Sequence, residues 1–319
     1  MDRLSVRVAA IRRETESVKA FVLASTTGDT LPPFSAGAHV DVRVILASGE
    51  AAWRSYSLAN DPAERGHYEI GVLRTRDGGG SAYLHDRINV GDTLDISVPS
   101  NRFPLAGHAG EHVLIAGGIG ITPLLSMART LARRAERFDL WYLARSADAM
   151  PFSGAVDRLG GGRAIKHFSR GESGGRLDLS RTLGQPAADK HVYVCGPRSL
   201  IDDTLRVARE LGYAEQAMHV ELFNAMAATD ETSFEVELAR SGVRFTVGPG
   251  ETILEQAHKR GVFPGSDCCR GECGTCLTRV LEGEPLHRDL YLTDAERSAN
   301  EFMTICVSRS RSPRLVLEL

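Results

Sequence analysis

The sequence predicts a multidomain protein that begins with a β-barrel or sandwich, continues as a doubly wound α/β domain and ends in a small domain around a cysteine loop. Short strands separated by Gly, Pro and Asp clusters fill residues 1–105. Buried apolar strands alternate with amphipathic helices over residues 106–225. Four of the six cysteines then lie within residues 268–276. These three patterns predict an α/β plus β architecture with three parts.

The bulk composition is that of a soluble globular protein. The chain has 319 residues, which is enough for two or three domains of roughly 100–200 residues each. A charged fraction of 25% and a formal net charge of −3 give no reason to expect nucleic-acid or membrane binding. No apolar run approaches the roughly 18 residues that a transmembrane helix needs. Residues 1–18 alternate apolar and charged side chains, which predicts a strand and not a signal peptide, and hence a cytoplasmic protein with reduced thiols.

The first 105 residues carry the period-two alternation of strands. Leu4, Val6 and Val8 alternate with polar residues and predict the first strand. Further strands are expected at residues 18–23, 40–44, 68–72 and 94–98, with a short helix at 81–87. Turn-forming clusters separate these runs, so a barrel or sandwich is expected.

The middle of the chain predicts a parallel sheet. Apolar runs are found at residues 112–116, 140–144, 164–168 and 192–195, and helical stretches at 123–136 and 200–212. Such alternation is typical of a doubly wound fold. Residues 226–233 are small and polar and predict a linker before a domain at 234–319, in which two strands and a helix precede the cysteine loop.

The cysteine loop has the spacing of an iron–sulfur site. Cys268, Cys273 and Cys276 form C-x4-C-x2-C, and Cys306 follows after 29 further residues. This is the plant-type ferredoxin spacing for a 2Fe–2S cluster. A tight loop can supply three thiolates, and its glycines let backbone amides turn toward the sulfurs.

Two other interpretations of these cysteines fit less well. A zinc site usually pairs two C-x2-C knuckles, and the loop has one. A thioredoxin-like C-x-x-C opens a helix, whereas residues 277–284 predict a strand and turn. The 2Fe–2S spacing leaves Cys269 as the surplus cysteine, a neighbour of the cluster.

Two turns in the middle domain are candidates for nucleotide binding. Gly117, Gly118 and Gly120 join an apolar strand to a helix, whose N-terminus attracts a pyrophosphate. The spacing is not that of a Rossmann motif, so the turn alone is a weak signal. The corner Cys-Gly-Pro at 195–197 ends another predicted strand, and ligands bind at the carboxyl edge of a parallel sheet. Taken alone, Cys195 is more typical of an ordinary small buried residue.

The stretch RSYS at residues 54–57 is the third candidate. Arg54 and Tyr56 would share one face of a strand, and Ser55 and Ser57 the other. An aromatic plane beside hydroxyls and a guanidinium suits a flat ring with a phosphate tail. The turn at 76–81 could add a phosphate nest of backbone amides. Taken alone, these stretches are more typical of a surface strand and a flexible turn.

Taken in order, these motifs resemble the phthalate dioxygenase reductase family. RSYS, GGIGITP, CGP and CCRGECGTC with Cys306 carry the resemblance, which spans nearly the whole chain and includes FPL, HRDLYLTDAE and CVSRS. The family includes reductase components of vanillate demethylase and other Rieske oxygenase systems. It implies a ferredoxin-reductase-type flavin β-barrel at residues 1–105, an NAD-binding domain at 106–225 and a β-grasp 2Fe–2S ferredoxin domain at 234–319.

The resemblance also implies site residues, carried over by motif. The flavin contacts would be Arg54, Ser55, Tyr56, Ser57, Gly71, Val72, Leu73, Gly79, Gly80 and Ser81. The nucleotide contacts would be Gly117, Gly118, Gly120, Thr122, Pro123, Arg145, Cys195, Gly196 and Pro197. Thr122 and Cys195 would position the nicotinamide, and Phe223 would cover the flavin. The cluster ligands would be Cys268, Cys273, Cys276 and Cys306.

The chemistry implied by the resemblance is electron transfer from NADH through a flavin and the cluster to an external Rieske-type oxygenase. The flavin links the two chemistries, because it accepts two electrons from the nicotinamide and passes them on one at a time. No protein acid or base is expected for the hydride step. FMN is the expected flavin. FAD is the alternative, since DGGG replaces an arginine-rich turn and PSN at 99–101 replaces PRN.

Arg145 could bind the 2′-phosphate of NADPH, but in the resembling family an arginine there accompanies NADH. We expect a monomer. The rival functions are a stand-alone flavin or ferric reductase, and a non-catalytic iron–sulfur sensor. The sensor would leave RSYS and GGIGITP without a role.

Overall fold

The computed structural model describes residues 3–75, 80–107, 109–170, 175–223 and 232–319. It divides into two units, Met1–Glu221 and Leu222–Leu319, which are considered separately. Most of the expected linker at 226–233 lies outside the described residues. None of the helices in the described ranges is long and apolar enough to cross a membrane.

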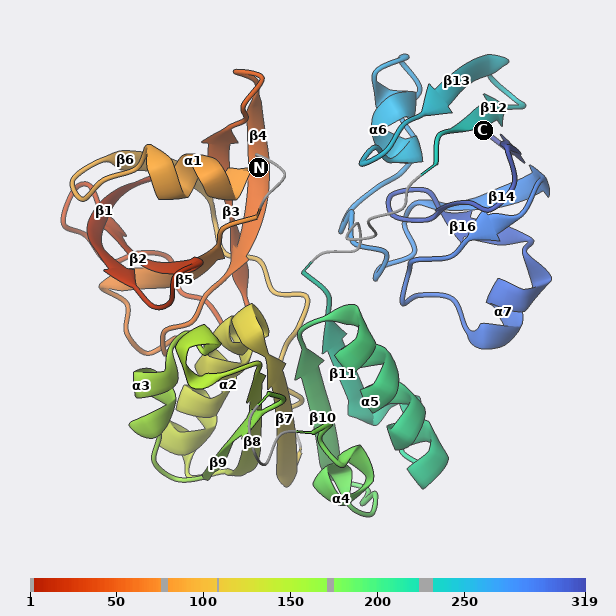
Figure 1. The fold of residues 1–319 in the computed structure, drawn as a ribbon. Coiled ribbons are helices and arrows are strands. Elements are labelled where there is room, and N and C mark those ends of the chain that lie inside the picture. Colours follow the sequence, from red (N-terminus) through yellow and green to blue (C-terminus); the bar gives the residue numbers. More distant parts are fainter. Residues whose placement is uncertain (1–2, 76–79, 108, 171–174, 224–231) are drawn as a thin grey trace. The chain divides into compact units, whose positions relative to one another are not determined.

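The first part of the Met1–Glu221 unit is an antiparallel barrel (Figure 1). Its strand order is β4-β3-β6-β1-β2-β5, and a bridge between Leu58 and Ile70 links the end of β4 to β5. Alternate side chains of β3, such as Val40 and Val42, are fully buried inside it. The elements are β1 (Arg3–Arg13), β2 (Val18–Ser25), β3 (His39–Ile45), β4 (Ala51–Ser57), β5 (His67–Leu73), α1 (Gly80–Asp86) and β6 (Thr93–Ser97). The barrel expected from the alternation is confirmed.

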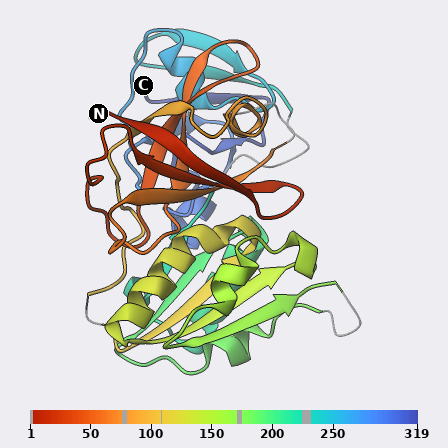
Figure 2. The same ribbon diagram turned by 90° about the vertical axis from the view of Figure 1, so that its left-hand side faces the viewer.

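The second part of this unit is a five-stranded parallel sheet in the order β11-β10-β7-β8-β9. In Figure 2 the yellow-green helices α2 and α3 cover its near face, and α4 and α5 cover the other. The chain leaves β7 on one side to form β8 and later returns on the other side as β10, so the strand order switches there. The elements are β7 (Glu111–Gly117), α2 (Ile121–Arg134), β8 (Arg137–Ala144), α3 (Ser153–Asp157), β9 (Arg163–Phe168), α4 (Leu179–Leu183), β10 (Lys190–Cys195), α5 (Arg198–Leu211) and β11 (Met218–Glu221). This is the doubly wound fold that the sequence predicts.

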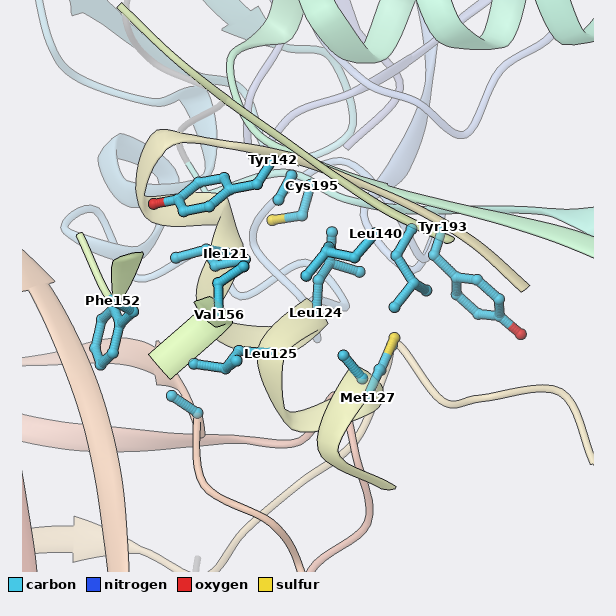
Figure 3. Close-up of a cluster of buried hydrophobic side chains, with 14 of the residues drawn as sticks. Ile121, Leu124, Leu125, Met127, Leu140, Tyr142, Phe152, Val156, Tyr193 and Cys195 are labelled. Atoms are coloured by element: carbon cyan, nitrogen blue, oxygen red, sulfur yellow. The ribbon is translucent and has the colours of Figure 1, made fainter. Parts of the chain in front are cut away.

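The core of the sheet lies under α2. Figure 3 shows Leu124 and Met127 of the helix facing Leu140 and Tyr193 of the strands. Each of these four side chains is fully buried. Apolar residues three and four apart on α2 supply this face, which is the helical period of an amphipathic helix. The core therefore fixes the helix that carries the nucleotide-binding turn at its start.

The Leu222–Leu319 unit is a small mixed sheet with the order β13-β12-β18-β14-β16. The two central strands β12 and β18 run parallel, and α6 packs its buried Ile253 and Leu254 against the sheet core. The elements are β12 (Phe234–Leu238), β13 (Val243–Val247), α6 (Ile253–His258), β14 (Leu277–Glu282), β15 (Pro285–Leu286), α7 (Asp294–Ala299), β16 (Phe302–Thr304), β17 (Arg309–Ser310) and β18 (Arg314–Leu317). The cysteine loop lies between α6 and β14, and the order agrees with the expected ferredoxin domain.

Candidate cofactor sites

The glycine turn after β7 and the Cys-Gly-Pro corner after β10 meet at one edge of the sheet. β7 and β10 are hydrogen-bonded parallel neighbours, with Ala116 opposite Cys195. A Cβ added at Gly120 would overlap the carbonyl oxygen of Cys195, and one added at Gly117 would lie 2.6 Å from Cδ of Pro197. Only glycine fits where two backbones approach this closely. We call residues 117–120 and 195–197 together the nucleotide corner.

The nucleotide corner leads directly into a long helix. Gly118–Gly120 forms one 3-10 turn, and α2 then continues for 14 residues. Thr122 donates its hydroxyl proton to the carbonyl of Ile119 at 3.1 Å, which tightens the turn. Pro123 lies in the first turn of the helix, where a missing N–H costs little. The free N–H groups of this turn and the helix dipole favour a pyrophosphate.

The expected flavin edge lies against this helix start. A Cβ at Gly71 of β5 would lie 2.7 Å from Cγ2 of Thr122 and 2.8 Å from Cε2 of Phe152. The structure therefore brings the segment Gly71–Leu73 of the barrel together with the nucleotide turn of the α/β domain. From the sequence, the first segment is expected to bind the flavin and the turn to bind the nucleotide, and the two lie side by side in the structure.

The RSYS strand lies beside the start of α1. Tyr56 is half-buried against the barrel core, and burial raises the pKa of its phenol to about 12, so the hydroxyl stays neutral. Arg54 is exposed, and its stem lies beside Gly80, where an added Cβ would be 2.8 Å from Arg54 Cγ. Ser81 is buried and its Oγ accepts a hydrogen bond from the Thr75 amide at 3.0 Å. Gly79 lies outside the described residues.

Two residues near these sites escaped the sequence analysis. Glu221 ends β11, is 2% exposed and accepts a 3.0 Å hydrogen bond from the Ser57 hydroxyl. The sequence signal that could have identified Glu221 is a carboxylate at the end of the short strand β11. Phe152, labelled in Figure 3, is a buried aromatic residue with φ of 57°, and an added Cβ at Gly71 would lie 2.8 Å from its ring. A bulky residue in the left-handed region is strained, and such strain often marks a functional site.

Two further predicted residues lie apart from this geometry. Arg145 is exposed just after β8, and its carbonyl accepts a hydrogen bond from the Arg170 amide at 3.1 Å. It therefore lies at the carboxyl edge of the sheet, where the adenosine end of a dinucleotide is expected. Phe223 is 37% exposed and belongs to the Leu222–Leu319 unit, so its role beside the flavin stays a prediction.

The cysteine loop directs backbone amides at its sulfurs. Cys268 Sγ accepts hydrogen bonds from the amides of Arg270 and Glu272, each at 3.4 Å. Cys273 Sγ accepts one from the Cys268 amide at 3.5 Å. The turns that allow this contain Gly271 at φ of 77° and Gly274 at φ of 73°. These contacts would stabilise thiolates and the negative charge of a cluster.

The thiol expected from afar joins the loop. Cys306 follows β16 and is buried, as are Cys268 and Cys276. A hydrogen bond with Cys306 lowers the pKa of Cys268 to about 3, and a second one lowers the pKa of Cys276. The two hydrogen bonds together raise the pKa of Cys306. Cys269 is exposed, with φ of 51°.

The donor set fits a 2Fe–2S cluster. Four thiols with inward amides are the ligands that such a cluster takes. Among the described residues, no three His, Cys, Asp or Glu side chains are grouped in a way that would hold a single metal ion. A 2Fe–2S cluster differs from such a site, because its four thiolates are shared between two irons.

Comparison with known proteins identifies the family. The family model described as an oxidoreductase FAD-binding domain matches residues 5–104, and the model described as a 2Fe-2S iron-sulfur cluster binding domain matches residues 236–311. A vanillate O-demethylase oxidoreductase of a Pseudomonas species is 39% identical, over 99% of this chain and all of the relative. The solved structure of phthalate dioxygenase reductase, described as modular for electron transfer from pyridine nucleotides to [2Fe-2S], is 35% identical. It has a TM-score of 0.78 and covers 99% of this chain and 98% of its own.

The chain belongs to the phthalate dioxygenase reductase family. It is an oxidoreductase with a flavin-binding domain and a 2Fe–2S cluster domain. The family also has members with other names, since a tetrachlorobenzoquinone reductase of Sphingobium chlorophenolicum is 39% identical over 99% of this chain and 98% of its own.

Proposed function

We propose that this chain is the reductase component of a Rieske-type mono- or dioxygenase, passing electrons from NADH through a flavin and the 2Fe–2S cluster to that partner. The observation that carries the proposal is the contact between Gly71 and Thr122, which brings the flavin edge to the nucleotide turn. The cluster unit of the same chain supplies the one-electron carrier. A bound flavin accepts two electrons as hydride and releases them singly, which joins the two chemistries.

The chain's own residues bind and orient in this proposal. Arg54 and Ser81 hold the flavin phosphate, Tyr56 packs beside the ring, and the backbone of Gly71–Leu73 lines its edge. The nucleotide corner holds the pyrophosphate and the nicotinamide, with Thr122 and Cys195 beside the reacting rings. Ser57 and Glu221 fix the strand ends on either side. No side chain is assigned as acid or base, since hydride transfer needs none.

The flavin is proposed to be FMN. Arg54 next to Gly80 offers one guanidinium to a terminal phosphate, as a mononucleotide requires. Acid extraction of the purified protein followed by chromatography separates FMN from FAD. Release of FAD alone would overturn this assignment.

The nucleotide preference is proposed to depend on Arg145 at the rim of the sheet. Comparison of kcat/KM for NADH and NADPH tests the preference in the native protein, and Arg145→Gln tests the residue. We expect the native protein to prefer NADH. A clear preference for NADPH would contradict the assignment.

The oxygenase partner is tested by reconstitution. Candidate Rieske oxygenases encoded near this chain are mixed with it, NADH and aromatic or other substrates, and the hydroxylated or demethylated product is measured. Product that requires both proteins supports the proposal. Failure of every candidate, with full NADH-dependent bleaching of flavin and cluster, would leave electron transfer intact and overturn the partner.

A quinone reductase is the second candidate, because one relative carries that name. Quinone reduction by this chain alone, faster than its transfer to any oxygenase, would favour it. We further propose that the protein is a cytoplasmic monomer. Light scattering of the holoprotein gives its molar mass and so tests the monomer.

A further inference from the structure

A buried carboxylate of the barrel lies between two arginines. Glu69 is 5% exposed and precedes Gly71 by two positions on β5. Arg12 of β1 bonds to one of its oxygens, and Arg129 of α2 donates to the other at 3.2 Å. Burial alone would raise the pKa of Glu69, but the two guanidinium groups outweigh burial and lower it. The group is therefore an ionised carboxylate that needs both partners.

Arg129 belongs to a stripe of α2 that faces the barrel. Thr122, Ser126 and Arg129 are four and three residues apart, so they share one helix face. Ser126 donates its hydroxyl proton to the carbonyl of Asn60 at 2.8 Å. Arg129 donates to the carbonyl of Ala59 at 2.8 Å as well as to the buried carboxylate. The helix is thus held at three successive levels, the first of which is the contact with the flavin edge.

A second contact between the two domains shares one arginine with the first. Glu14 accepts a hydrogen bond from the amide of Phe152 at 2.9 Å, just before α3. Arg12 bonds to Glu14 at 3.3 Å as well as to Glu69. We call Arg12, Glu14, Glu69 and Arg129 the Glu69 clamp. The clamp joins two barrel strands to the two helices that border the flavin edge.

We propose that the Glu69 clamp sets the position of the nucleotide turn against the flavin edge, which makes Glu69 and Arg129 positioning residues for hydride transfer. This inference rests on the proposed function. Arg129 lies seven residues after Thr122, about 10 Å along the helix, so a small tilt at the clamp displaces the start of α2. Hydride transfer depends on reacting atoms held within about 3–3.5 Å, and a misplacement of about 1 Å costs roughly 100-fold.

The test uses the full-length holoprotein in anaerobic stopped-flow with NADH. Flavin bleaching over a range of NADH concentrations gives a limiting reduction rate and an apparent Kd. Glu69→Gln keeps the size of the side chain and removes its charge. Arg129→Lys keeps the charge and replaces the planar guanidinium, whose Nη1 donates to both Glu69 and the Ala59 carbonyl, with a shorter-reaching ammonium.

We expect the limiting rate to fall by roughly 30- to 100-fold in Glu69→Gln and about tenfold in Arg129→Lys. The apparent Kd, the flavin content and the cluster content should stay within about twofold of wild type. The primary isotope effect with NADH deuterated at C4 should change, which mere loss of stability would not produce.

The matched control is Arg133→Lys. Arg133 lies one turn further along α2, is 47% exposed and pairs with the partly buried Asp61 at 3.1 Å. Its limiting rate should stay within about twofold of wild type, because lysine keeps the charge at an arginine that is itself exposed. An equal loss in this control would overturn the clamp.

Wild-type limiting rates in Glu69→Gln and Arg129→Lys would also overturn the clamp. Should Glu69→Gln lose its flavin or fail to fold, Arg129→Lys decides alone by the same rate. If NADH bleaches the wild-type flavin and the variants react at the same rate, the clamp is overturned while the proposed function stands. A flavin-loaded wild type that NADH does not bleach overturns the proposed function and the clamp with it.

Discussion

The cluster loop and the nucleotide corner are built in opposite ways. The loop offers three thiol side chains, Cys306 adds a fourth, and backbone amides donate to the loop sulfur of Cys268. The nucleotide corner instead presents backbone groups to its ligand. Its glycines are needed there because the ends of β7 and β10 approach too closely for a Cβ atom. The first site should therefore fail when a side chain is exchanged. The second should fail when a side chain is added.

The largest expected effect is at the distant ligand of the loop. Cys306→Ser should abolish the cluster, because serine oxygen is a poor replacement for a buried thiolate ligand. The 2Fe–2S EPR signal after reduction checks this. Flavin content and NADH-dependent ferricyanide reduction should remain. A full EPR signal in this variant would remove Cys306 from the ligand set.

The next effect is the addition of one methyl group to the corner. Gly120→Ala should slow flavin reduction by NADH roughly 100-fold, because its Cβ would overlap the Cys195 carbonyl and force the turn away. Flavin and cluster content should not change. Gly66→Ala is the control, since an added Cβ there meets open space. Equal rates in the two variants would refute the close-approach argument.

A smaller effect is expected at Glu221, the buried carboxylate that ends β11. Because Glu221 acts through its side chain, it contrasts with the neighbouring nucleotide corner, where the backbone makes the contacts. Glu221→Ala removes the acceptor of the Ser57 hydroxyl and should destabilise the flavin-bound unit by about 1–3 kcal/mol. Thermal release of the flavin measures it. Glu215→Ala, at an exposed pair with Arg209, should change stability by less than about 0.5 kcal/mol. A Glu221→Ala protein as stable as this control would exclude a structural role.

The sheet that carries the corner should also respond to acid. Burial, and secondarily His191 and His112, lower the pKa of His219 to about 4. The unfolded value is about 6.5, so this contribution is complete above about pH 6.5 and is lost as the pH falls toward 4. After allowance for the partial exposure of the ring it amounts to roughly 1 kcal/mol. His219→Gln should flatten the fall in thermal midpoint between pH 7 and pH 5, and an unchanged slope would count against it.

The smallest effect is expected at the neighbour of a ligand. Cys269→Ser should keep the EPR signal and electron transfer within about twofold, because Cys269 is exposed while its neighbour Cys268 is buried. Loss of the signal would reassign the ligands. Beside the loss expected at Cys306, this variant separates thiols that bind from thiols that are merely near.

The fold was largely predictable because its strands and long helices carry strong periodicity. The short helices α3, α4 and α7 were not expected, since five or six residues carry only a weak helical pattern. The proposed cysteine ligands follow from spacing alone. Glu221 and the Glu69 clamp do not, because their partners lie 57 to 164 residues away and only the folded chain brings them together. The left-handed backbone of Phe152 has no sequence signal at all.

The glycine-lined corner has a practical consequence for redesign. Gly117, Gly120 and Gly196 leave no room for an added side chain, so libraries aimed at a different nicotinamide cofactor would lose most members by mutating these glycines. Useful diversity lies at the rim, around Arg145 and Arg170, where the described side chains are exposed and the fold tolerates change. In this scaffold the catalytic geometry and the cofactor choice can be engineered as separate variables.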